Sequence, residues 1–154
     1  MLVALLPILA TAQPGNGGWC ASNNYSRLFD AKTIVEMKGT IEKIEKIAPE
    51  KGMSVGIHLM VKTSNNEKMS VHLGPAWYLD NQEVQFAASD KITVKGSKIT
   101  YQNALAIIAV SVMRGEQTLL LRDKKGVPKW NAWRQGAGSG KGKAKGSKRN
   151  QQNR

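Results

Sequence analysis

Two alternating runs around a polar turn constrain the fold of this chain more than any other feature. Apolar residues occupy every second position in 55–61, and the same alternation returns in 69–73 after the Ser-Asn-Asn turn at 64–66. A period of two places successive side chains on opposite faces of a strand. Two such runs joined by a short polar turn predict a β-hairpin.

A longer alternating stretch precedes this hairpin, over residues 35–47. Its apolar phase runs through Val35, Met37, Gly39 and Ile41 and then slips, because the next apolar residue is Ile44. A single slip in a period of two indicates a β-bulge, and a glycine within a strand permits a tight bend. A long, bent first strand that contributes to both halves of the sheet is typical of small Greek-key barrels.

The remaining segments complete the order of elements. Pro75 to about Gln82 is predicted as a short helix, because proline is favoured in the first turn of a helix. Further strands are expected at 92–101, 105–113 and 118–122. Three strands, a short helix and then more strands is the OB-fold order. The sequence therefore predicts an all-β protein: a five- to six-stranded Greek-key OB-fold barrel with one short helix between strands 3 and 4.

The two ends of the chain differ from this central part in composition. An apolar run of eight residues is followed by Ala-Thr-Ala at 10–12, which predicts a signal peptide over 1–12 and a periplasmic or secreted protein. The run is shorter than the roughly 20 residues of a membrane-spanning helix, so no membrane span is expected. Residues 13–24 are predicted to be a linker, 25–135 the OB-fold domain and 136–154 a disordered basic tail.

Positive charge is the main functional signal in the composition. The chain carries 23 Lys and Arg against 11 Asp and Glu, a net charge of +12. Residues 136–154 contain six basic residues and no acidic one, so half of the excess lies in the tail. This balance favours a polyanionic partner, either single-stranded nucleic acid or an acidic protein. The tail residues expected to bind it are Lys141, Lys143, Lys145, Lys148 and Arg149.

A second group of candidate ligand-binding residues ends the predicted domain. Trp130 and Trp133 lie beside Lys129 and Arg134. Exposed aromatic rings with basic neighbours suit the stacking of single-stranded bases. The alternative is that the two tryptophans cover the open end of the barrel.

The predicted hairpin also holds candidate metal ligands. If the phase of Ile57 and Leu59 points inward, His58, Met60 and His72 point outward, with the two histidines opposite or diagonal. Imidazole combined with thioether suits copper. The alternative is that these are polar strand residues with no ligand, and no other cofactor is expected.

Motifs that carry catalytic chemistry are absent from the sequence. The chain has two histidines and one cysteine, and it lacks a Gly-x-Ser-x-Gly elbow, a phosphate loop and a dinucleotide fingerprint. Asp90 and Asp123 lie in predicted turns, where aspartate accepts backbone hydrogen bonds. We therefore expect a protein that is not an enzyme.

Four segments resemble a group of small exported bacterial OB-fold proteins that are often labelled only as DNA-binding or uncharacterised. They lie at 56–59, 71–78, 90–97 and 121–130, and the most specific is His-Leu-Gly-Pro-Ala-Trp-Tyr. The resemblance covers residues 25–133. It implies the OB-fold and an exported location, and it implies no catalytic residues.

These observations favour one function and leave two alternatives. We expect a monomeric, exported, non-catalytic OB-fold binding module for nucleic acid or another polyanionic or acidic ligand. The first alternative is a periplasmic copper-binding protein that uses the two histidines and the methionine. The second is a protein–protein adaptor.

Overall fold

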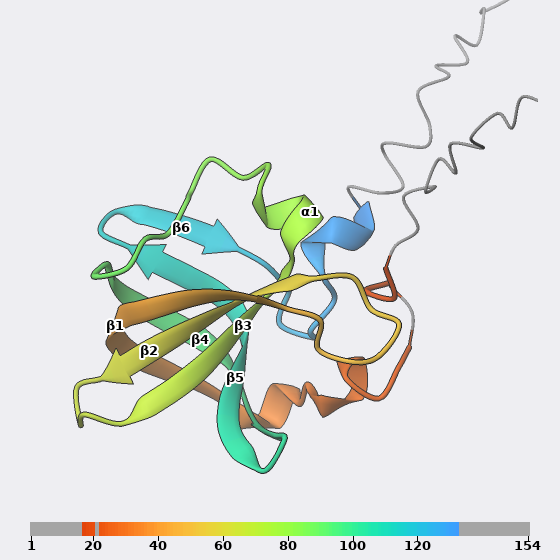
Figure 1. Cartoon of the computed structure of the whole chain (residues 1–154), viewed down its shortest axis with the longest axis horizontal. Helices are drawn as coiled ribbons and strands as arrows, with labels where there is room; N and C mark the ends of the chain where they lie inside the picture. Colours follow the sequence, from red (N-terminus) through yellow and green to blue (C-terminus); the bar gives the residue numbers. More distant parts are fainter. Residues whose placement is uncertain (1–16, 21, 133–154) are drawn as a thin grey trace, which may run out of the picture.

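The computed structural model describes residues 17–20 and 22–132, which form a β-barrel with short helical segments at its ends (Figure 1). Two 3₁₀ helices, η1 (Ser26–Leu28) and η2 (Ala31–Thr33), precede the first strand. The helix α1 (Ala76–Leu79) lies between the third and fourth strands. The strands are β1 (Ile34–Ile47), β2 (Gly56–Thr63), β3 (Lys68–Pro75), β4 (Lys91–Tyr101), β5 (Ala104–Arg114) and β6 (Gln117–Leu120).

The sheet closes into a barrel through one parallel pairing. The strand order is β3-β2-β1-β4-β5-β6, and an additional parallel pairing of β3 with β5 closes the first five strands. The sixth strand, β6, pairs antiparallel with β5 beyond the closed barrel. The predicted all-β barrel, with one short helix between strands 3 and 4, is confirmed and is consistent with an OB-like fold.

The first strand belongs to both halves of the barrel, as the sequence predicts. β1 pairs with β4 over residues 34–40 and with β2 over residues 39–47, and its register shifts between Ile41 and Lys43. A Cβ atom at Gly39 would lie 2.5 Å from Val61 Cγ1 and 2.6 Å from the carbonyl oxygen of Lys62. Glycine therefore permits the close approach of β2 where β1 bends.

Inward-pointing apolar side chains of the strands fill the barrel interior. Ile41, Leu59, Val61, Val71 and Val94 are almost completely buried. The predicted hairpin is confirmed, since β2 and β3 pair antiparallel and its turn is closed by the amide of Thr63 donating to the carbonyl of Glu67. Alternation thus places the apolar side chains of these strands inside the barrel.

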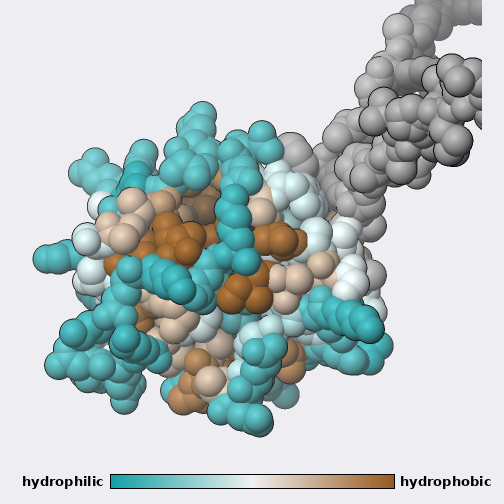
Figure 2. Space-filling model, viewed as in Figure 1, coloured by the Kyte–Doolittle hydropathy of each residue, from teal (hydrophilic) through white to brown (hydrophobic). Residues whose placement is uncertain are grey.

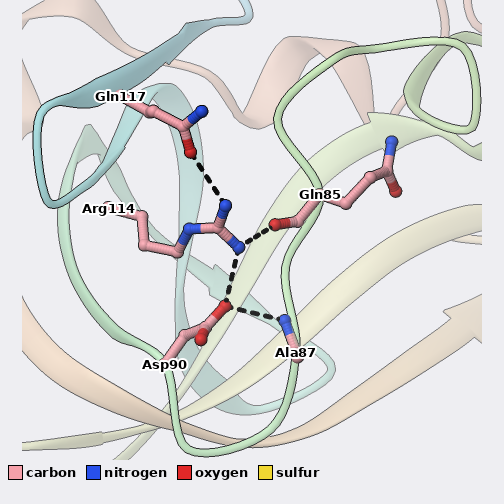
Figure 3. Close-up of polar contacts among 5 residues, drawn as sticks. All are labelled: Gln85, Ala87, Asp90, Arg114 and Gln117. Carbon is pink, nitrogen blue, oxygen red and sulfur yellow. Dashed lines mark hydrogen bonds and ion pairs between the residues drawn. The ribbon is translucent and has the colours of Figure 1, made fainter.

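Hydrogen bonds of Arg114 and Asp90 hold the long loop between α1 and β4 against the end of β5 (Figure 3). The Arg114 guanidinium donates to the carbonyl of Gln85, to the Asp90 carboxylate at 3.2 Å and to the Gln117 side chain at 2.8 Å. Asp90 also accepts the amide of Ala87 at 2.9 Å. The Ala87 hydrogen bond and the Arg114 guanidinium lower the pKa of Asp90. This aspartate has the turn role that the sequence predicts.

The boundaries of two elements differ from prediction. The helix ends at Leu79 and not at Gln82, and the side-chain amides of Asn81 and Gln82 donate to the carbonyls of Trp77 and Tyr78. These contacts satisfy carbonyls that a longer helix would use. The last strand stops at Leu120, after which Arg122 forms an isolated bridge with Pro128.

The folded core reaches into the segment predicted as a linker. Trp19 is buried, contacts the rings of Tyr25 and Trp130, and donates from Nε1 to the carbonyl of Ser54 at 2.9 Å. Part of 13–24 therefore packs on the barrel, because it carries a large aromatic side chain that stabilises the fold when it is removed from water. The predicted signal peptide and basic tail lie outside the described residues. No helix within 17–20 and 22–132 has the length and apolar character needed to cross a membrane.

Candidate functional site

The two histidines meet across the β2–β3 hairpin, as the sequence predicts. His58 and His72 are cross-strand partners, and a register shift beside His58 fixes this pairing. Their rings stack with centroids 3.8 Å apart and an angle of 6° between their planes. The hydroxyl of Tyr25 lies 3.0 Å from Nδ1 of His72 and hydrogen-bonds to it.

Neither of the two histidines is exposed to solvent. His58 is 2% exposed and His72 is completely buried. The Tyr25 ring stacks on His72, and the Tyr101 ring lies edge-on against both imidazoles. The outer surface of this hairpin is therefore covered, which a period of two in one strand does not reveal.

Burial keeps both imidazoles neutral at neutral pH. Desolvation lowers the pKa of His58 to about 4, although the nearby Glu45 acts in the opposite direction. Desolvation, His58 and Arg122 together lower the pKa of His72 to about 3. A proton on either ring would be a poorly solvated charge next to a second ionisable group.

The stacked arrangement does not assemble a copper site as it stands. Imidazole lone pairs lie in the ring plane, so the two Nε2 atoms of nearly parallel rings cannot point at one ion. Met60 is paired with Ser70 and is half-buried. Within 17–20 and 22–132, no cluster of three or more His, Cys, Asp or Glu side chains is placed to hold a metal ion. Copper binding at His58, Met60 and His72 stays a hypothesis that requires the rings to rotate.

The aromatic residues expected to stack bases are not arranged for that purpose. Trp130 is 1% exposed and packs against Tyr78, with ring centroids 5.6 Å apart. The exposed-edge prediction is therefore wrong for Trp130, and the C-terminal end of the described chain lies beside α1 (Figure 1). Lys129 is exposed. The other predicted residues lie outside the described part of the chain: Trp133, Arg134, Lys141, Lys143, Lys145, Lys148 and Arg149.

The outer face of β1 carries a different set of cations. Thr40 on β1 is the register partner of both Lys62 on β2 and Lys91 on β4, so these three side chains share one face. Lys38 stands two residues before Thr40 and faces Thr93 on β4. Three lysines from three adjacent strands thus converge at the bend of β1.

A groove of about 350 Å³ separates these lysines. It is lined by the three lysines and by polar or apolar neighbours, and none of its lining residues is acidic or aromatic. Lys38, Lys62 and Lys91 are exposed and form no ion pair within the described residues. By contrast, Lys43, Lys46 and Lys68 each contact a carboxylate. We call the three lysines and their groove the lysine groove.

The sequence analysis did not select the lysine groove. Two of the lysines lie out of phase with a buried neighbour, which is the signal that they point outward: Lys62 follows Val61 and Lys91 precedes Ile92. The missing information was the register between β1 and β4, which are separated by the whole hairpin and α1. Figure 2 shows that hydrophilic side chains project over much of one face, so exposed charge alone does not single out a site.

Comparison with known proteins places the chain in a family. No curated protein matches it. The model of the MamS/MamX magnetosome protein family matches residues 33–119. This span includes all three lysines of the groove and all the strands, apart from the last residue of β6. Because this match covers more than half of the chain, the chain belongs to the MamS/MamX magnetosome protein family.

Proposed function

We propose that this protein is a non-catalytic binding module whose lysine groove binds an acidic protein segment. The observation that carries the proposal is the convergence of Lys38, Lys62 and Lys91 on one face with no acidic residue in the groove. Unpaired cations from three strands offer several contacts to a chain of carboxylates. The basic tail adds affinity without adding specificity.

The lining of the groove favours carboxylates over stacked bases. Recognition of single-stranded nucleic acid uses exposed aromatic rings as platforms. All eight aromatic residues within the described part of the chain are buried or half-buried, and none lines the groove. Nucleic acid, which the sequence resemblance suggests, is therefore the alternative outcome of the test.

The energetics set the expected strength. Exposed lysines remain hydrated, and an exposed ion pair contributes about 0.2–1 kcal/mol. Three such contacts correspond to roughly a threefold to a hundredfold gain in affinity at low salt. Binding of this kind weakens as ionic strength rises, since the Debye length falls to about 8 Å at 0.15 M.

The cellular setting is part of the proposal. The name of the family refers to the magnetosome, and we propose that the chain acts there as an exported protein. Cofractionation of the tagged full chain with isolated magnetosomes tests this placement, and its recovery only in the soluble cytosolic fraction would contradict it.

The binding proposal is tested with the full chain and two variants of equal charge. One carries Lys38→Gln, Lys62→Gln and Lys91→Gln in the groove. The matched control carries Lys124→Gln, Lys125→Gln and Lys129→Gln, which are also exposed and lie after β6. Titration with poly-L-glutamate and with oligothymidylate measures both candidate ligands.

We expect the groove variant to lose about threefold to a hundredfold in affinity for poly-L-glutamate, and the control to lose much less. Equal losses in the two variants would show that only net charge matters and would refute a defined groove. Tighter binding of oligothymidylate than of poly-L-glutamate would favour nucleic acid over the acidic protein.

A further inference from the structure

A second charged feature lies next to Trp130 and shares no lining residue with the lysine groove. Arg122 is 5% exposed, yet no carboxylate contacts it within the described residues. The adjacent Asp123 uses its carboxylate to accept the amides of Lys125 and Val127. Burial of a guanidinium without an acid is costly and calls for a compensating partner.

The fold holds this guanidinium in one orientation. Its Nη1 donates to the carbonyls of Leu73 and Ala109, and its Cζ lies 4.7 Å from the ring centroid of Trp130. Nε and Nη2 form no hydrogen bond to any residue in 17–20 or 22–132. These two atoms form the side of the guanidinium that binds a carboxylate through two parallel hydrogen bonds. Burial lowers the pKa of Arg122 to about 10, so it remains charged at neutral pH.

Arg122 borders a pocket of about 220 Å³. Trp19, Tyr25, Ile108 and Trp130 contribute apolar surface to its lining, and none of the lining residues is acidic. Ligand pockets for drug-sized molecules span about 300–1,000 Å³, so this one suits a smaller group. It shares no lining residue with the lysine groove.

A second polar atom in the pocket lacks a partner. The side-chain oxygen of Asn131 is buried and accepts no hydrogen bond within the described residues. Asn131 lines the same pocket as Arg122. The pocket is therefore lined by an arginine with two free donor atoms, by an asparagine with a free acceptor and by aromatic side chains. A ligand that satisfies all three carries a carboxylate, a nearby N–H and an apolar group.

We propose that this pocket binds the carboxylate end of an acylated amino acid, which is the chemistry of a free peptide C-terminus. The carboxylate contacts Nε and Nη2 of Arg122, the amide N–H donates to Asn131, and the side chain packs against Trp19 and Trp130. The pocket residues on which this rests lie outside the span that the family model matches, 33–119, apart from Ile108. The site shares no lining residue with the lysine groove, so the two proposals stand or fall separately.

The test uses ligands that differ by one group. N-acetylphenylalanine supplies the carboxylate and the N–H, its C-terminal amide lacks the charge, and 3-phenylpropionate lacks the N–H. Binding is followed in the full chain by two-dimensional NMR, in which the indole N–H signals of Trp19 and Trp130 report on the pocket and that of Trp77 serves as a control. A hexapeptide ending in phenylalanine, with a free or an amidated C-terminus, distinguishes a peptide from a small molecule as the source of the carboxylate.

We expect the acid to bind at least about tenfold more tightly than its amide, and to shift the signals of Trp19 and Trp130 but not that of Trp77. Arg122→Met should abolish this preference, while Lys129→Met, which removes an exposed charge nearby, should preserve it. Asn131→Ala should weaken N-acetylphenylalanine severalfold and leave 3-phenylpropionate unchanged.

Equal affinity for the acid and the amide, or shifts confined to other tryptophans, would overturn the proposal. Both measurements use the unaltered chain, so they test the proposal even if Arg122→Met fails to fold. Stronger binding of the free hexapeptide than of N-acetylphenylalanine would identify a peptide terminus as the ligand, and equal binding would identify a small acylated amino acid.

Discussion

The lysine groove and the region around His72 and Arg122 both contain basic side chains, but these are exposed in the groove and buried around His72 and Arg122. Lys38, Lys62 and Lys91 stand on the uncovered outer face of β1, where water solvates each ammonium group. His72 and Arg122 lie under aromatic rings, where one has lost its charge and the other depends on backbone carbonyls. What differs is whether another segment covers the strand.

The covering segments come from the two ends of the folded part. Trp19 and Tyr25 arrive from before β1, and Trp130 arrives from after β6. Trp130 contacts the Arg122 guanidinium, while Tyr25 contacts His72. Changes to the covering aromatic residues are therefore expected to alter stability, whereas changes to the groove lysines are expected to alter the binding of the acidic segment and leave stability unchanged.

Removal of a covering aromatic residue should have the largest effect. Trp130→Ala empties a fully buried site and removes the cation–π contact with Arg122, so we expect a loss of about 5 kcal/mol in the free energy of unfolding. Chemical denaturation measures it. The half-buried Trp77→Ala is the control and should cost clearly less; equal losses would show that Trp130 is not a core residue.

Acidification should destabilise the fold through the two buried histidines. The pKa values of His58 and His72 fall from 6.5 to about 4 and about 3 on folding, so the unfolded chain binds protons first as the pH drops. The stability is fully present well above pH 6.5 and is lost below it, with a slope that rises from about half of 1.4 kcal/mol per pH unit for each histidine at pH 6.5 toward the full value at lower pH. Between pH 6.5 and 4.5 the total loss is about 4 kcal/mol.

Denaturation curves recorded across that interval provide the measurement. The Asp90 carboxyl has a lowered pKa, so its own contribution is lost at lower pH and does not obscure the histidines. A His58→Gln variant should show about half of the slope. An unchanged slope in this variant, or a stability that stays constant to pH 4.5, would contradict the buried, neutral pair.

Loss of one hydroxyl should have a smaller effect. Tyr25→Phe leaves Nδ1 of His72 buried without its hydrogen-bond partner, and we expect a loss of about 2 kcal/mol. Tyr101→Phe is the matched control, since its hydroxyl donates to the carbonyl of Pro49 in a half-buried position. A loss for Tyr25→Phe no greater than that for Tyr101→Phe would argue against a tightly packed Tyr25–His72 contact.

The smallest effect on stability is expected in the groove. Lys38→Gln, Lys62→Gln and Lys91→Gln remove exposed charges without ion pairs, and each should change the free energy of unfolding by less than about 0.5 kcal/mol. Thermal denaturation of the triple variant checks this expectation. A large loss of stability would mean that these lysines belong to the structure and not to a binding surface.

The barrel could be predicted from the sequence because its strands are marked by patterns within short segments of the chain. The phase slip after Ile41 and the glycine at 39 predicted the bulge and bend of β1, and the alternation in 55–73 predicted the hairpin. The candidate functional site was harder to predict from the sequence, because it depends on contacts between segments that are distant along the chain. Register between β1 and β4 gathers the groove lysines, and packing of Trp19, which was assigned to a linker, buries residues near the histidines.

The salt dependence of binding shows directly whether the lysine groove is a defined binding site for an acidic ligand. Affinity of the full chain for poly-L-glutamate is measured over a range of salt concentrations for the unaltered protein, the groove variant and the control variant with its substitutions at 124, 125 and 129. We predict that the groove variant has the shallowest dependence of log affinity on log salt, because three ionic contacts are gone. Slopes that are the same for the groove and control variants would contradict a defined binding site on the outer face of β1.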